Sequence, residues 1–174
     1  MKMQVYVDET KAKGYVIAAA VIPMADLDHL RKAMRGLLPR GQRRIHMVSE
    51  SEPLRRKILA VLGDEGAQVD LYAAGRTRVT DIDRRRACLE QLVRDLAATC
   101  ILLTLESDET QDRRDRRDLA AITHRAGCPE LRYGHQTPYV EPLLWIPDAV
   151  GWAYARGGEW RRLAAPSIRR VVAV

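Results

Sequence analysis

The sequence predicts an α/β layer fold, in which a mixed five-stranded β-sheet carries helices on its faces. Two strand-like segments joined by a short turn open the chain, and strand-like and helix-like segments then alternate along the rest of it. The length of 174 residues, with 47% hydrophobic and 30% charged residues, is typical of one globular domain with a buried core. We therefore expect residues 1–174 to form a single domain.

The first half of the chain is expected to contain a β-hairpin, two helices and a short strand. Apolar and polar residues alternate over residues 3–7, and the wholly apolar run at 15–22 follows a turn, which is typical of a hairpin. Apolar residues then recur at helical spacing over residues 27–38 and again over 54–62. Between these two helices, a short strand is expected at residues 44–47.

The second half of the chain continues the alternation. Strands are expected at residues 69–74 and 100–105, on either side of a helix at 80–96 whose apolar residues follow the helical repeat throughout. The remaining expected elements are, in order, a charged helix at residues 112–125, a loop at 127–138 and an apolar helix at 139–155 that is kinked or begun afresh at Pro147.

Several classes of protein are excluded or disfavoured. The longest wholly apolar run, residues 15–22, is much shorter than the roughly 20 residues of a membrane span. The odd number of cysteines without a close pair is typical of reduced thiols, so a cytoplasmic location is expected. Signature motifs of P-loop, Rossmann, serine-hydrolase and zincin proteins are absent. His124, Cys128 and His135 are too loosely spaced to predict a zinc site and are interpreted as unrelated surface residues.

The charge is basic and unevenly distributed. The net charge of +6 is the sign expected of a protein that meets a polyanion, although nearly all of it is arginine, which a GC-rich genome also favours. Residues 31–57 hold nine basic and two acidic residues. With no phenylalanine in the chain, a stacking platform for single strands would have little beyond Tyr133 and Trp145. The arginines best placed to hold phosphates are Arg40, Arg43 and Arg44.

Carboxylates fall at the ends of two expected strands and inside an apolar segment. Asp8 and Glu9 directly follow the first strand, Glu106 directly follows the strand at 100–105, and Asp148 lies among apolar residues. Ionised carboxylates are seldom buried unless they are paired or bind a metal. Because hard divalent cations take oxygen ligands, Asp8, Glu106 and Asp148 could converge on a site for Mg²⁺ or Mn²⁺.

Each of these residues also has a simpler interpretation. Asp8 and Glu9 could lie in an exposed hairpin turn, where acids are common. The acids that begin at Glu106 could favour the N-terminal dipole of the next helix. Asp148 could be buried in an ion pair with an arginine, and His46 could be a packed histidine at a strand end.

Four short motifs are spread over nearly the whole chain. They are Val7-Asp8-Glu9-Thr10, Ile45-His46, Thr104-Leu105-Glu106-Ser107 and Leu144-Trp145-Ile146-Pro147-Asp148-Ala149-Val150-Gly151. In order and content they resemble the ribonuclease H-like family grouped as Domain of Unknown Function 3800. Its members show Asp-Glu-Ser-Gly after the first strand, Leu-His after the third, Ile-Ile-Asp-Glu in a later strand and Leu-Gln-x-Ala-Asp-Leu-Val-Ala near the end.

This resemblance implies a ribonuclease H-like mixed five-stranded sheet with helices on both faces. It implies that Asp8, Glu106 and Asp148 hold Mg²⁺ or Mn²⁺, and that Glu9 and His46 lie beside them in the catalytic site. In ribonuclease H-like enzymes a fourth acid usually comes from the helix after the third strand. The approximate candidates for that position are Glu50 and Glu52.

Two functions from different classes follow. The leading hypothesis is a metal-dependent nuclease that hydrolyses phosphodiester bonds in RNA or DNA, with the arginines neutralising the flanking backbone. The alternative is a catalytically inactive ribonuclease H-like module that binds a protein or a nucleic acid. The departures from the family pattern at Glu106, Trp145 and Pro147 favour this alternative.

Overall fold

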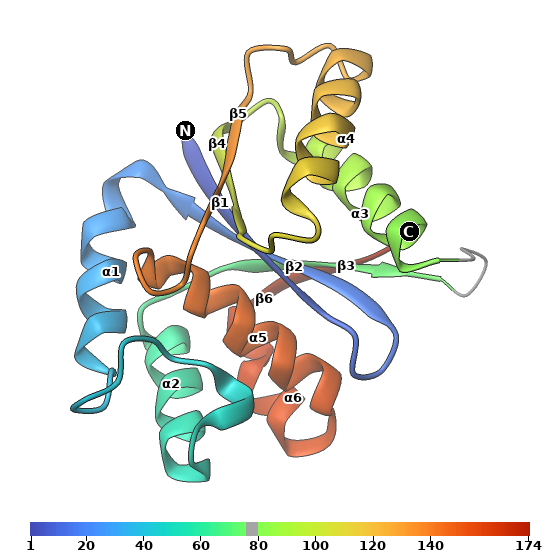
Figure 1. Cartoon of the computed structure of the whole chain (residues 1–174). Helices are drawn as coiled ribbons and strands as arrows, with labels where there is room; N and C mark the ends of the chain where they lie inside the picture. Colours follow the sequence, from blue (N-terminus) through green and yellow to red (C-terminus); the bar gives the residue numbers. More distant parts are fainter. Residues whose placement is uncertain (76–79) are drawn as a thin grey trace.

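The computed structural model describes residues 1–75 and 80–174 and has an α/β architecture built on a mixed six-stranded sheet (Figure 1). The strands are β1 (Met3–Thr10), β2 (Tyr15–Pro23), β3 (Val69–Ala74), β4 (Cys100–Glu106), β5 (Arg132–Gln136) and β6 (Ile168–Ala173). The helices are α1 (Leu27–Gly36), α2 (Glu52–Asp64), α3 (Asp81–Leu96), α4 (Asp112–Arg125), α5 (Trp145–Arg156) and α6 (Gly158–Ala164), and short 3₁₀ turns include η2 (Met47–Ser49) and η3 (Pro142–Leu144).

The strand order in the sheet is β5-β4-β1-β2-β3-β6. β1, β2 and β3 form an antiparallel meander, whereas β4 lies parallel to β1, β5 parallel to β4, and β6 parallel to β3. Val7 of β1 is the register partner of Leu105 of β4. The residues that follow these two positions, Asp8 and Glu106, therefore lie side by side toward the same end of the two strands, as the sequence predicts. β1 continues to Thr10, however, so Asp8 and Glu9 lie within the strand and pair with β2 rather than following the strand or forming a hairpin turn.

Helices cover both faces of the sheet, and each face has its own hydrophobic core. Tyr6 points to the face that is packed by α1, α2, α5 and α6, whereas its neighbours Val5 and Val7 point to the face that is packed by α3 and α4. β2 is apolar, and its residues 15–22 are buried because both faces of the strand are covered (Figure 1). This arrangement explains the uninterrupted apolar run at residues 15–22.

The structure corrects the predicted elements at four places. Residues 44–47 are not a strand, although Ile45 and Met47 are buried; they form a loop that leads into the turn η2. β5 lies within the expected loop at 127–138, and β6 was not expected at all. Both are short edge strands whose sequences lack a long apolar run, so they gave little signal. Because the expected strand at 44–47 is lost and these two are gained, the count changes from the expected five to six.

The expected helix at 139–155 begins later, as α5. Its start is delayed by the turn η3, and Pro147 falls in the first turn of α5, where its missing N–H would have had no helical partner. The proline therefore does not kink the helix body. Among the described residues, no helix combines the length and the apolar character that crossing a membrane requires.

Candidate functional site

Three of the predicted acids meet in one cleft. Asp8 lies near the end of β1, Glu106 is the last residue of β4, and Asp148 lies in the first turn of α5, which packs across β1 and β2. A cleft of about 490 Å³ is lined by all three carboxylates together with His46 and Glu9. The topology thus brings together acids from the first strand, the fourth strand and the fifth helix of the chain.

Asp8 carries a charge that its surroundings do not compensate. Burial raises the pKa of Asp8 well above its ordinary value, and the negative charges of Glu106 and Asp148 raise it further. A hydrogen bond between the Asp8 and Glu106 carboxyl groups adds to this rise, and the Glu9 backbone N–H, which donates to Asp8 Oδ1 at 2.7 Å, opposes it. The site consequently favours a bound proton or a bound cation over a bare carboxylate.

Asp148 is positioned by the loop that was predicted as a strand. The backbone N–H of Met47 donates to Asp148 Oδ2 at 2.9 Å. Burial raises the pKa of Asp148 to about 6, although this hydrogen bond and the charges of His46 and Arg44 lower it. The burial of Ile45 and Met47 anchors this loop, so the loop presents an N–H group to the carboxylate and places His46 at the rim of the cleft.

The predicted arginines lie on this same loop. Arg44 Nη1 is 3.3 Å from Glu106 Oε1, and its guanidinium also lies 5.8 Å from the centre of the Tyr139 ring. Arg43 is exposed and lies 4.9 Å from the same ring, and Arg40 is exposed. Arg44 is therefore part of the carboxylate site, Arg43 shares the Tyr139 ring with it, and Arg40 is available to solvent farther back on the loop.

The donor set suits a hard divalent cation. Arg44 pairs with Glu106, but among the described residues no ion pair includes Asp8 or Asp148. Three carboxylates with a single cationic partner leave an excess of negative charge in a partly enclosed cleft. Carboxylate oxygens are the ligands that Mg²⁺ and Mn²⁺ prefer, so the chemistry of these residues suits such an ion. In the described part of the chain, however, these three acids are not a group whose ligand atoms all lie within 4.8 Å of one another, so binding one ion would require their side chains to move closer together.

Glu9 is tied to its own partners rather than to the carboxylate site. It accepts hydrogen bonds from Tyr15 and from Arg85 Nη1, the latter at 2.7 Å, and Lys11 Nζ lies 3.2 Å from its carboxylate. Burial raises the pKa of Glu9, but the bond from Tyr15 and the charge of Arg85 outweigh it and the pKa is lowered. Glu9 lines the cleft as an ionised, compensated carboxylate.

Neither candidate for a fourth acid lies in the cleft. Glu50 is buried, and its Oε1 accepts a hydrogen bond from the His46 backbone N–H at 3.0 Å, which stabilises the turn η2. Glu52 is exposed on α2 and pairs with Arg56. Among the described residues, the further acid that lines the cleft is Asp108, which follows β4.

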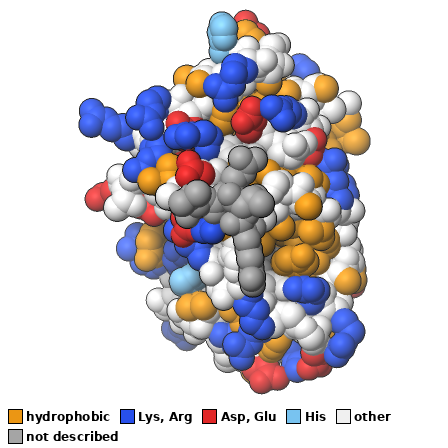
Figure 2. Space-filling view, turned by 90° about the vertical axis from the view of Figure 1, so that its right-hand side faces the viewer, with side chains coloured by type: hydrophobic (Ala, Val, Ile, Leu, Met, Phe, Trp, Pro, Cys, Tyr) orange, Lys and Arg blue, Asp and Glu red, His pale blue; other side chains and the backbone are white. Residues whose placement is uncertain are grey.

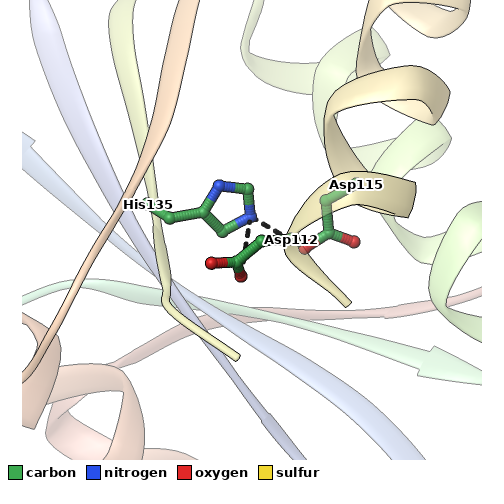
Figure 3. Close-up of side chains that lie close together, drawn as sticks. All are labelled: Asp112, Asp115 and His135. Atoms are coloured by element: carbon green, nitrogen blue, oxygen red, sulfur yellow. Dashed lines mark hydrogen bonds and ion pairs between the residues drawn. The ribbon is translucent and has the colours of Figure 1, made fainter. Parts of the chain in front are cut away.

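A second acidic cluster, which the sequence did not reveal, lies between α4 and β5 (Figure 3). His135 Nε2 is 3.0 Å from Asp115 Oδ2 and 3.5 Å from Asp112 Oδ1. One ligand atom from each of the three residues lies within 4.8 Å of the others, so this cluster could hold a metal ion. The interpretation of His135 as a surface residue was wrong, because its side chain is only 2% exposed. No local sequence pattern links a strand histidine to aspartates twenty residues earlier.

The Asp115 carboxylate of this second cluster is already compensated without a metal. Arg85 donates to both carboxylate oxygens of Asp115, at 2.7 and 2.8 Å. If His135 bound a metal through Nε2, its proton would lie on Nδ1, which is buried without a hydrogen-bond partner. Metal-bound histidines usually donate from their second nitrogen. A proton on Nε2, donated to Asp115, suits the surroundings better.

The aromatic residues near the cleft differ from those expected. Trp145 is buried, and its Nε1 donates to the Pro138 carbonyl oxygen at 2.7 Å, so it cannot stack on a ligand. Trp152, one turn beyond Asp148 on α5, lines a cavity that adjoins the cleft instead. Trp152 follows Asp148 by four residues, and this spacing places the two side chains on the same face of a helix, so the sequence could have indicated that they lie close together.

Comparisons with protein-family models, with curated proteins and with solved structures find no match to this chain.

Proposed function

We propose that this protein is a metal-dependent nuclease of the ribonuclease H-like kind, hydrolysing phosphodiester bonds in RNA or DNA. The observation that carries the proposal is the convergence of Asp8, Glu106 and Asp148 in one cleft, with the pKa of Asp8 raised well above its ordinary value. Groups with strongly perturbed pKa values in a cleft are typical of functional sites. The mixed sheet with helices on both faces supports the architecture that the family resemblance implies, although it has six strands rather than five.

Each residue of the site has a role in this reaction. Asp8, Glu106 and Asp148 would hold Mg²⁺ or Mn²⁺, which when bound activates water and stabilises the leaving oxygen. The Met47 N–H orients Asp148. His46 lines the cleft and is exposed, so it can hold or donate a proton.

The surroundings of the carboxylates add charge and shape to the site. Arg44, beside Glu106, and the exposed Arg40 and Arg43 would neutralise phosphates that flank the scissile bond. The change to proline at Pro147 leaves Asp148 in place, because the first turn of a helix accommodates proline. Pro147 is therefore no longer an argument for a catalytically inactive module.

The proposal is tested by cleavage of end-labelled single-stranded RNA, single-stranded DNA, DNA duplex and RNA/DNA hybrid in the presence of Mg²⁺ or Mn²⁺. We expect the wild type to cut at least one substrate, and Asp8→Asn and Asp148→Asn to lower the rate by 100-fold or more. His135→Gln removes the imidazole from the cluster of Asp112, Asp115 and His135, and this variant should keep most of the activity.

Two outcomes would overturn the assignment. If the wild type leaves every substrate intact, the inactive binding module becomes the better description. If Asp8→Asn cuts as well as the wild type while His135→Gln does not, the reaction depends on the cluster of Asp112, Asp115 and His135.

A further inference from the structure

A second cavity adjoins the cleft and shares its carboxylates. It has a volume of about 360 Å³, within the range of roughly 300–1,000 Å³ that is usual for small-ligand pockets. Asp8, Glu9, His46 and Asp148 line both hollows. The carboxylates therefore lie at a junction, with open space on two sides of them.

The two hollows differ in chemistry. Beyond the shared residues, the cleft continues along polar groups such as Ser107 and Asp108. The second cavity continues along Val48, Pro147 and Trp152, and we call this part the base pocket. Val48 is 62% exposed, although it is aliphatic. An apolar wall of this kind suits a flat, apolar face of a ligand better than a phosphate.

The apolar wall is held rigid without a ligand. The Arg55 guanidinium lies 4.5 Å from the centre of the Trp152 ring, and it donates to the backbone oxygens of Met47 at 2.7 Å and Val48 at 2.8 Å. Trp160 packs edge-on against Trp152, with ring centres 5.1 Å apart. Arg55 thus fixes Trp152 and Val48 relative to each other, which lowers the entropic cost of binding.

The charges near the base pocket favour a nucleic acid strand as its occupant. Lys11 lines the cavity, and the Arg55 guanidinium lies over the ring of Trp152, which also lines it. Arg44 lies on the other side of the carboxylates, beside Glu106. A strand that crosses the site would therefore meet basic groups before and after the carboxylates, as its phosphates require.

We propose that the base pocket binds one unpaired nucleobase of a single-stranded nucleic acid, while the adjacent phosphodiester lies at Asp8, Glu106 and Asp148. This inference rests on the proposed function and names its substrate as single-stranded. A base in a duplex is stacked and paired and cannot enter the pocket unless it is flipped out. An unpaired base can lie against Trp152 and Val48 whatever its identity.

Binding can be measured apart from cleavage in the Asp8→Asn variant. Fluorescence anisotropy of a labelled 12-nucleotide strand should show affinity at least about 10-fold higher than that of the same sequence as a blunt duplex. Trp152→Leu and Val48→Asp, each added to Asp8→Asn, should weaken single-strand binding about 10-fold, the loss expected from one stacked base. Val48 is exposed, so its replacement tests the pocket even if Trp152→Leu disturbs the fold.

Tyr154→Leu provides the matched control. Tyr154 is an aromatic residue on the same helix that packs under Arg161 and is not among the described residues lining the pocket, so its loss should change affinity less than about 2-fold. Equal affinity for strand and duplex, or unchanged binding in both pocket variants, would overturn the base pocket even if the protein is a nuclease. Pocket-dependent binding by a wild type that cuts nothing would overturn the nuclease and leave the base pocket standing.

Discussion

Asp148 is a residue whose placement opposes the stability of the fold. Its pKa is about 6 in the folded chain against an ordinary value of 3.8, because it is buried. The folded state therefore binds this proton more tightly than the unfolded state does. The resulting stability is fully present below about pH 4 and is lost as pH rises through about 6, so the ionised group weakens the fold at neutral pH.

We accordingly expect Asp148→Asn to be more stable than the wild type at pH 8 in the presence of a chelator. The shift from 3.8 to about 6 corresponds to about 3 kcal/mol at most. The asparagine oxygen can still accept the Met47 N–H, so little else is lost. Urea unfolding at pH 8 and pH 4.5 measures the difference between the two proteins. A difference that does not shrink toward pH 4.5 would show that ionisation of Asp148 is not its cause.

At the scale of elements, a buried ion network joins β1 to the α3 and α4 layer. Arg85 of α3 is 8% exposed and bonds to both oxygens of Asp115 on α4 and to Glu9 on β1. Asp115 in turn contacts His135 of β5. This network sets the direction of the Glu9 side chain, which follows Asp8 directly, and so it separates Glu9 from the carboxylate site.

Replacing Arg85 by methionine should destabilise the protein by about 3–5 kcal/mol, because it leaves the buried Asp115 without its arginine and leaves Glu9 with Lys11 alone. Arg56→Met is the matched control, since Arg56 makes equally short ion pairs with Glu52 and Glu159 on the surface. Its effect on the urea midpoint should be much smaller, because solvent screens exposed pairs. If the two variants have similar urea midpoints, the buried ion pairs of Arg85 contribute no more to stability than the exposed pairs of Arg56.

The sequence predicts those elements whose pattern is local. β1 to β4 and the helices between them follow from apolar alternation and helical spacing, and the meeting of Asp8 with Glu106 follows from the end positions of two strands. β5 contains Arg132, Gly134 and His135 and so has no apolar run, and it becomes a strand by pairing with β4. The burial of His135 could not be predicted for the same reason, because it depends on the pairing of β5 with β4.

At the scale of the whole molecule, the excess positive charge is not gathered into one uniform surface. Figure 2 shows a face whose upper half carries interspersed basic and acidic side chains, while hydrophobic side chains gather lower down beside Lys and Arg. The net charge of +6 therefore does not by itself locate a binding site. The excess of negative charge in the cleft is a more specific feature, because it lies within a basic protein.

A cation bound by Asp8, Glu106 and Asp148 would join β1, β4 and α5, which come together only in the folded chain. Such an ion stabilises the native state by RT ln(1+[L]/Kd), about 2.7 kcal/mol at 100 times Kd. For a chain of this length we expect Mn²⁺ to raise the Tm by roughly 5–10 °C at pH 8. At pH 5 the rise should be smaller, since protons compete for Asp8 and Asp148, whose pKa values are raised.

Differential scanning fluorimetry with and without Mn²⁺ measures this rise, and variants locate the ion. Asp8→Asn should abolish the Mn²⁺-dependent rise in Tm, because a ligand is removed and the excess charge falls. His135→Gln should retain it, because its cluster is already satisfied by Arg85. The reverse pattern would place the ion between α4 and β5. Equal rises in the wild type and in Asp8→Asn, His135→Gln and the double variant would mean that Mn²⁺ acts elsewhere on the molecule.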